Sequence, residues 1–138
     1  GKLKIAFTDG TQTSEKQLLT FTSWIKDIDT ALAGSDIVAL TSFNEGTPVS
    51  LIEAQAANKP IVTTNVGGIE NVVIPGQTAL LCDNNNIAQV ADALLELVEN
   101  DELRASMAEK GWRHVKEKFH YTRLVRDMEN LYERLLQK

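Results

Sequence analysis

The chain has 138 residues, of which 43% are hydrophobic and 24% are charged. This length supports one domain with a hydrophobic core but not two, and a net charge of −5 argues against a nucleic-acid partner. The single cysteine, Cys82, excludes a disulfide within the chain, and no apolar run approaches the length of a membrane span, so we expect a cytoplasmic protein.

Two strands are expected near the N-terminus, at residues 2–8 and 18–24. The first alternates polar and apolar residues, and the second is apolar and β-branched. The connection between them is shorter than the dozen or so residues that a helical crossover needs. Two interpretations stay open: the strands form an antiparallel hairpin, or a helix that normally joins them is missing.

The next segments predict a short helix and then a βαβ unit. Residues 25–34 have apolar residues at helical spacing, and Gly34 is a typical helix stop. Residues 37–40 are continuously apolar, as expected for a strand covered on both faces. Pro48 suits the first turn of a helix, Lys59-Pro60 would end that helix, and residues 61–64 form a β-branched strand before a glycine pair.

The loop and helix of this unit carry residues suited to a nucleotide-sugar. Glu45 lies on the loop and Glu53 on the helix, with Gly46 and a helix N-terminus between them. Free backbone N–H groups at a helix N-terminus favour a phosphate. Carboxylates cannot bind phosphate but accept hydrogen bonds from sugar hydroxyls. The pattern therefore indicates sugar, diphosphate and sugar in succession.

The remaining residues predict one strand and three helices. Residues 69–73 form a single turn, residues 78–82 form the last strand, and Cys82 is expected to pack as a small apolar residue. Apolar residues at helical spacing then define helices from about residue 87, from Asn100 or Asp101, and from Tyr121 to the end. We interpret these apolar residues as core, and His114 and His120 as surface or packing residues rather than metal ligands.

A specific motif connects these observations to a known family. Its residues run through the βαβ unit, preceded by Ser35-Asp36: Glu45-Gly46-Thr47-Pro48-x-Ser50-x-x-Glu53-Ala54-x-Ala56, then Pro60-Ile61-Val62-x-Thr64-x-Val66-Gly67-Gly68. The pattern resembles the family-four retaining glycosyltransferases of the GT-B fold, in the half that binds the nucleotide-sugar donor. The resemblance covers the chain from roughly Trp24 onward. It implies a Rossmann-like three-layer α/β/α sandwich with a mostly parallel sheet, truncated or rearranged at the N-terminus, and two C-terminal helices.

The resemblance also implies roles for individual residues. Glu45 would be the catalytic residue that contacts the donor sugar, and Glu53 would bind the ribose hydroxyls. Gly67 and Gly68 would form a loop near the donor pocket. The residues expected to bind the donor sugar and its phosphates follow Glu45 or begin the helix: Gly46, Thr47, Pro48, Ser50 and Leu51.

The expected activity is transfer of a hexosyl group from a nucleotide-diphosphate sugar, such as a UDP-sugar, to an acceptor hydroxyl with retention of configuration. No metal and no other cofactor are expected. Residues 1–138 would be a single donor-binding domain whose N-terminal acceptor domain is absent, so the chain alone is expected to be inactive. A missing central strand would leave a gap in the sheet, which a strand-exchanged dimer would close.

Two alternatives remain on the sequence alone. Nucleotide-sugar epimerases share the two-domain architecture and would change the donor without an acceptor. A non-catalytic binding or interaction domain would keep the fold and lose the chemistry. The net charge of residues 1–100 is −7, so this chain by itself is expected to bind a diphosphate weakly.

Overall fold

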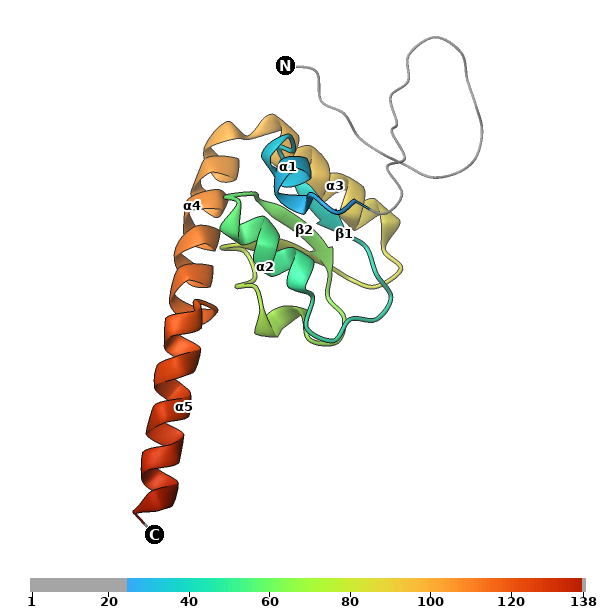
Figure 1. Cartoon of the computed structure of the whole chain (residues 1–138). Helices are drawn as coiled ribbons and strands as arrows, with labels where there is room; N and C mark the ends of the chain where they lie inside the picture. The colour runs from blue at the N-terminus through green and yellow to red at the C-terminus, as the bar shows by residue number, and fades with distance from the viewer. Residues whose placement is uncertain (1–24, 138) are drawn as a thin grey trace.

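The computed structural model describes residues 25–137 and shows a small parallel sheet covered by helices, with one helix running away from it (Figure 1). The strands expected at residues 2–8 and 18–24 lie outside the described residues. The described elements follow in chain order: α1 (Ile28–Ala33), β1 (Val38–Leu40), α2 (Val49–Ala56), β2 (Ile61–Thr64), the 3₁₀ turn η1 (Ile69–Asn71), β3 (Ala79–Cys82), α3 (Ile87–Glu99), α4 (Asp101–Lys118) and α5 (Tyr121–Leu136).

The described sheet has three parallel strands in the order β1-β2-β3. Val38 pairs with Ile61, and Ile61 pairs in turn with Ala79, so the strands start in register. All four residues of β2 are buried. The expectation that β1 is covered on both faces is wrong for the described part of the chain, because Ala39 is exposed and its neighbours are only half-buried. The physical reason is that β1 lies at the edge of the described sheet.

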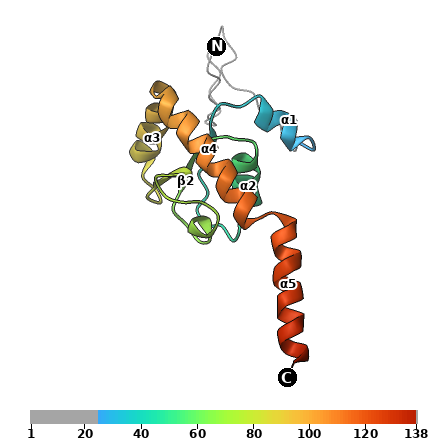
Figure 2. The same cartoon turned by 90° about the vertical axis from the view of Figure 1, so that its left-hand side faces the viewer.

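Helices cover both faces of the sheet, which produces the expected three layers. Figure 2 shows α3 on one side of β2 and α2 on the other, with α4 crossing beside the sheet. Each face has its own core because successive residues of a strand point to opposite faces. The face toward α2 is packed by Leu32, Leu51, Ala54, Ile61, Ile69, Val72, Val73 and Ala79. The face toward α3 is packed by Val62, Cys82, Ala93, Leu97 and Met107.

Helix α2 begins and ends close to where the sequence predicts. Pro48 is the N-cap with φ −74°, one residue before the first helical residue. The helix ends before Lys59-Pro60, because Asn58 adopts a left-handed conformation with φ 55°. The N–H of Lys59 then donates to the carbonyl of Ala54 at 2.9 Å, which satisfies a carbonyl at the helix end. Asn58 therefore supplies the stop signal that the sequence analysis assigned to the proline.

Helix α4 packs closely across α2. Gly111 is buried at the crossing, where an added Cβ would lie 3.1 Å from Cγ of Gln55. A glycine at this position lets the two helices approach, although glycine usually weakens a helix interior. The N-terminal half of α4 reaches the other face of the sheet, where Met107 is almost fully buried. One helix thus joins the two cores.

Helix α5 is confirmed as a helix, but its apolar residues are not core. Every described residue of α5 is exposed, and the helix extends away from the sheet in both views (Figures 1 and 2). Its exposed large apolar residues recur every three or four positions: Tyr121, Leu124, Val125, Met128, Leu131, Tyr132, Leu135 and Leu136. The periodicity was sufficient to predict the helix, whereas burial depends on a packing partner. None of the described helices is long and apolar enough to cross a membrane.

The two histidines are packing or surface residues, as expected. His120 is exposed and its Nδ1 accepts from the N–H of Thr122 at the start of α5. His114 is half-buried on α4 and lies edge-on to the ring of Phe119. Burial lowers the pKa of His114, and the charge of Lys118 lowers it further; contact with the backbone of Val72 and the charge of Glu117 act in the opposite direction.

We expect Leu97→Ala to lower the free energy of unfolding by about 2–5 kcal/mol, because it leaves a cavity in the core against α3. Leu97 is fully buried. Leu95→Ala, two residues earlier on the same helix, is the matched control, since Leu95 is 52% exposed. Leu95→Ala should lower the free energy of unfolding by about 1 kcal/mol or less. Urea denaturation measures both, and equal losses for the two variants would contradict the assignment of this face.

The stability of the chain should fall as the pH decreases from about 7 to about 5, in part because of His114. Its pKa is lower in the folded state, so the unfolded chain takes up a proton first and is favoured on acidification. His114→Asn should make this dependence shallower, whereas His120→Asn should leave the contribution of His114 in place. Urea midpoints measured across this pH range test the prediction, and it is wrong if the wild-type and His114→Asn curves stay parallel.

Candidate functional site

The predicted site lies at the carboxyl ends of β1 and β2. In an open parallel sheet, loops at this end commonly bind ligands. The loop after β1 is tied to the end of β2 by a side chain, because the hydroxyl of Thr64 donates to the carbonyl of Ser42 at 2.6 Å. Thr64 is 5% exposed, so this bond is largely shielded from solvent. The two strand ends are therefore held together at the point where the loop toward Glu45 begins.

The glycine pair packs directly on the backbone of Glu45 and Gly46. The N–H of Gly68 donates to the carbonyl of Glu45 at 3.0 Å. A Cβ added to Gly67 would lie 1.9 Å from the carbonyl oxygen of Glu45, and one added to Gly68 would lie 1.9 Å from that of Gly46. Gly67 also has φ 54°, a conformation that favours glycine. Both glycines are required for the close approach of the two loops, whether or not they also contact a ligand.

The N-terminus of α2 is open to solvent. Gly46, Thr47, Val49 and Ser50 are all exposed, so no packed side chain blocks the start of the helix. Pro48 has no capping hydrogen bond from its side chain. Within the described residues, the N–H groups of Val49 and Ser50 have no hydrogen-bond acceptor. Two unpartnered donors at the positive end of a helix dipole form a place where an anion is stabilised.

Pro48 and Leu51 are positioned differently from the other residues predicted to bind phosphate. Pro48 is buried and has no N–H to donate. Leu51 is 0% exposed and packs in the core, and its N–H already donates to the carbonyl of Pro48 at 3.1 Å. These two residues shape the start of the helix. At the start of the helix, the backbone N–H groups of Val49 and Ser50 have no acceptor among the described residues and can contact a ligand.

Glu45 and Glu53 lie on either side of this helix start in the sequence, and both are half-buried. Glu45 is three residues before the N-cap, and Glu53 lies at the start of the second helical turn. Among residues 25–137, neither carboxylate forms a hydrogen bond or an ion pair. Both therefore keep their oxygens available as acceptors, which is what recognition of hydroxyl groups requires.

A positive charge of α4 contacts the segment that follows the glycine pair. Lys118 donates from Nζ to the carbonyl of Asn71 at 2.7 Å, at the end of η1. No set of three or more His, Cys, Asp or Glu residues suited to hold a metal ion occurs in the part of the chain that the structure describes. Burial, followed by the neighbouring charge of Asp83, raises the pKa of the Cys82 thiol, which agrees with its packing in the core.

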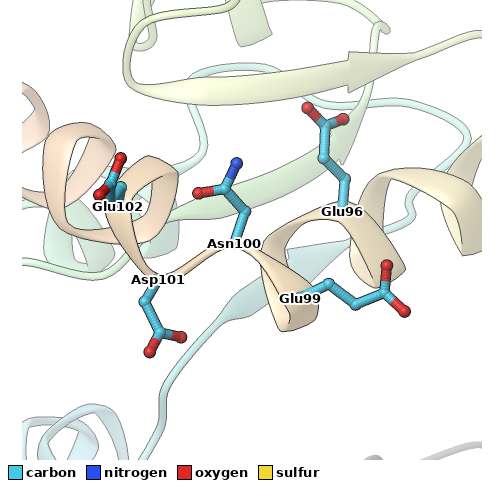
Figure 3. Close-up of a pocket in the computed structure, with 5 residues that line it drawn as sticks. All are labelled: Glu96, Glu99, Asn100, Asp101 and Glu102. Atoms are coloured by element: carbon cyan, nitrogen blue, oxygen red, sulfur yellow. The ribbon is translucent and has the colours of Figure 1, made fainter.

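Two hollows on the surface lie away from the predicted site. One is at the connection between α3 and α4 and is lined by Glu96, Glu99, Asn100, Asp101 and Glu102. Figure 3 shows Glu96 and Asp101 pointing to opposite sides of that connection, so the carboxylates do not converge on a common centre. The other is lined by residues of β3, α3 and the preceding turn. Neither includes a residue that the sequence analysis assigned to the donor.

Two residues have contacts at this site that the sequence does not predict. Thr64 belongs to the motif quoted above, but nothing in its neighbourhood indicates that its hydroxyl reaches the loop after β1. Gln55 is fully buried, with Nε2 donating to the carbonyl of Val72 at 2.8 Å. The one available signal was its place among apolar residues on the inner face of α2, where an amide needs buried hydrogen-bond partners.

We expect Gly68→Ala to lower the free energy of unfolding by about 1–3 kcal/mol, because its Cβ would overlap the carbonyl of Gly46. Gly34→Ala is the matched control. Its Cβ would meet only ordinary contacts at 3.7 Å and 3.8 Å, and its φ is −81°. The free energy of unfolding of this variant should stay within about 1 kcal/mol of that of the wild type. Thermal and urea unfolding of the two variants test the pair, and a tolerated Gly68→Ala would mean that the loops can separate freely.

Comparison with known proteins finds a family match that includes the predicted site. The family model described as glycosyl transferases group 1 matches residues 7–114. D-inositol 3-phosphate glycosyltransferase of Corynebacterium jeikeium is 39% identical over 101 residues, which is 73% of this chain and 24% of that protein. N-acetyl-alpha-D-glucosaminyl L-malate synthase of Bacillus anthracis is 36% identical over 101 residues, or 73% of this chain and 26% of that protein.

Solved structures share the fold. Sucrose-phosphate synthase from Thermosynechococcus elongatus superposes with a TM-score of 0.79 at 23% identity, covering 88% of this chain and 31% of that one. The C-terminal domain of a glycosyl transferase group 1 family protein from Francisella tularensis gives a TM-score of 0.65 at 25% identity, covering 73% and 52%. Anabaena HepE in complex with UDP gives 0.79 at 21% identity, covering 85% and 32%.

The chain spans about a quarter of the length of the curated relatives it matches. The family match covers most of the chain, and the solved structures have the same Rossmann-like arrangement found in GT-B glycosyltransferases. The chain therefore belongs to the glycosyl transferases group 1.

Proposed function

We propose that this chain is the domain that binds the nucleotide-sugar donor in a retaining glycosyltransferase. The observation that supports this most directly is the open N-terminus of α2, where the N–H groups of Val49 and Ser50 have no acceptor among the described residues. A diphosphate would accept from them. Anabaena HepE, whose fold resembles this one, was solved in complex with UDP. The donor here would be a nucleotide-diphosphate hexose, with UDP as the first nucleotide to test.

In the proposed glycosyl transfer, the site would stabilise the negative charge that develops on the leaving diphosphate. As the bond between the sugar and the diphosphate breaks, negative charge grows on the leaving phosphate oxygens. Hydrogen-bond donors that are already oriented stabilise this charge more than they stabilise the ground state, which lowers the barrier. Val49 and Ser50 would supply those donors through the backbone, and Gly46 and Thr47 would line the sugar and phosphates. No metal ion is required in this proposal.

The two carboxylates would orient the hydroxyl groups at either end of the diphosphate. Glu45 would accept from hydroxyls of the donor sugar and hold its anomeric carbon toward the acceptor, which is a positioning role. Glu53 would accept from the ribose hydroxyls. The packing of Gly67 and Gly68 on the Glu45 loop supports this assignment, because it restrains the backbone that carries the proposed catalytic carboxylate.

The acceptor would be bound by a second domain that this chain does not contain. Its relatives are about four times as long as the matched region, which supports a larger enzyme. Without that domain, the chain is expected to bind the donor weakly and to transfer nothing. Exchange of N-terminal strands between two copies is proposed as one way to complete the sheet, and light scattering at several concentrations would test it.

A nucleotide-sugar epimerase-like domain is the second candidate, and a non-catalytic binding domain is the third. The carboxylates of Glu45 and Glu53, which have no partner in the part of the chain that the structure describes, favour a ligand with hydroxyl groups over a protein partner at this site. Incubation with donor alone separates the first two functions, since only an epimerase changes the sugar without an acceptor. Absence of any response to nucleotides would favour the binding domain.

Titration with UDP, GDP and ADP tests the site itself. We expect one of these nucleotides to shift the backbone amide signals of residues 46–53 in NMR spectra, because the diphosphate would accept from N–H groups there. Signals at the far end of α3, such as that of Glu99, should remain unchanged and provide an internal control. A titration in which the same three nucleotides shift no signal between Gly46 and Glu53 would exclude the proposed donor site.

We expect Glu53→Gln to weaken binding of the nucleoside diphosphate about tenfold, because a charged acceptor for two ribose hydroxyls is replaced by a weaker one. Glu45→Gln should leave the nucleoside diphosphate unaffected and weaken only the nucleotide-sugar. Glu99→Gln, on the exposed end of α3, is the control for the change in charge. Calorimetric titration of both ligands measures these effects, and equal behaviour of the two ligands in Glu45→Gln would contradict the proposed sugar contact.

A further inference from the structure

A buried amide lies behind the candidate site, between the helix and the glycine loop. Gln55 is 0% exposed, on the face of α2 that packs against η1 and α4. An apolar residue would be the ordinary choice at such a position, because burying an amide costs free energy unless it is hydrogen-bonded. Its presence calls for a reason beyond packing.

The two hydrogen bonds that this amide donates join two parts of the site. Nε2 donates to the carbonyl of Leu51 at 3.0 Å and to that of Val72 at 2.8 Å. Leu51 belongs to the first turn of α2, next to the free N–H groups of Val49 and Ser50. Val72 directly follows η1, the turn that continues from Gly68. The reversed orientation of the amide would place an oxygen against two carbonyl oxygens, so this orientation is chemically required.

The amide is held in place from the other side by α4. Gly111 lies over the side chain, where a Cβ would be 3.1 Å from Cγ of Gln55. Oε1 of Gln55 is buried without a hydrogen-bond partner in the described part of the chain. The amide therefore forms hydrogen bonds only as a donor. Together these two bonds connect the first turn of α2 to the segment after the glycine pair.

We propose that Gln55 is a positioning residue for the diphosphate site. It sets the first turn of α2 relative to residues 67–72, and the same residues hold the loop of Glu45 through the N–H of Gly68. The amide thereby determines how far the free N–H groups of α2 lie from the proposed catalytic carboxylate. This inference rests on the proposed function for its ligand, while its structural part is testable without one.

Gln55→Met removes both hydrogen bonds and keeps a similar side-chain length. Without ligand, we expect the Gly68 amide to exchange its hydrogen about tenfold faster relative to the amides of β2, because its loop loses one anchor. With ligand, the dissociation constant for UDP should rise about tenfold. That for uridine should change less than about twofold, because uridine lacks the phosphates and its proposed ribose contact, Glu53, lies beyond the first turn of α2 that Gln55 sets.

Met107→Ala is the control for a loss of core packing, because Met107 is 1% exposed and belongs to the core on the opposite face of the sheet. It should lower stability without a selective effect on Gly68 or on UDP. Gln55→Glu provides a second test. A carboxylate cannot donate, whereas the protonated acid can donate once. Protection of Gly68, compared with the wild type at each pH, should therefore recover partly on acidification, which a change in packing alone does not produce.

The outcomes separate the two proposals. Unchanged exchange at Gly68 in Gln55→Met, with the variant folded, would overturn the positioning role, as would equal losses of affinity for UDP and uridine. Faster exchange at Gly68 in a chain whose wild-type form binds no nucleotide would support the structural link through Gln55 but overturn both the proposed function and the role at a diphosphate site. Faster exchange together with selective loss of UDP affinity is the expected result.

Discussion

The arrangement of the site depends on the contact between two loops that have no side chains between them. Gly67 and Gly68 approach the backbone of Glu45 and Gly46 so closely that a single Cβ would collide with a carbonyl oxygen. One hydrogen bond, from the N–H of Gly68 to the carbonyl of Glu45, closes the contact. A backbone contact of this kind has few rotatable bonds, so it restrains the loop more tightly than a contact between long side chains.

The two hydrophobic cores, one on each face of the sheet, differ in how close they lie to the candidate site. The core toward α3 contains the core-facing residues of α3 and the start of α4, and it lies away from the candidate site. The core toward α2 contains Leu51 and Ile69, which immediately adjoin the helix start and the glycine pair. Burial on this face therefore fixes the elements that carry the exposed N–H groups of Val49 and Ser50. The site is solvent-exposed, but the segments that form it are anchored in the core.

The chain also presents surfaces that its own described residues leave uncovered. Helix α5 has an apolar stripe with every residue exposed, and β1 lies at the edge of the described sheet. The amphipathic pattern of α5 is typical of a helix that buries one face. Within residues 25–137, the His120 cap and the Arg123–Asp127 ion pair at 3.2 Å are local contacts that support it.

The sequence alone determined which segments become helices and strands after residue 25, because apolar periodicity and turn residues are local signals. The same local signals placed Glu45, Glu53 and the glycine pair on one βαβ unit, and the motif there was enough to identify the family. Only the tertiary structure decided which residues are buried and which are joined. Gln55 contacts Val72, and α5 stays exposed in the described part of the chain, because burial depends on neighbours that are distant in sequence and that a local pattern does not specify.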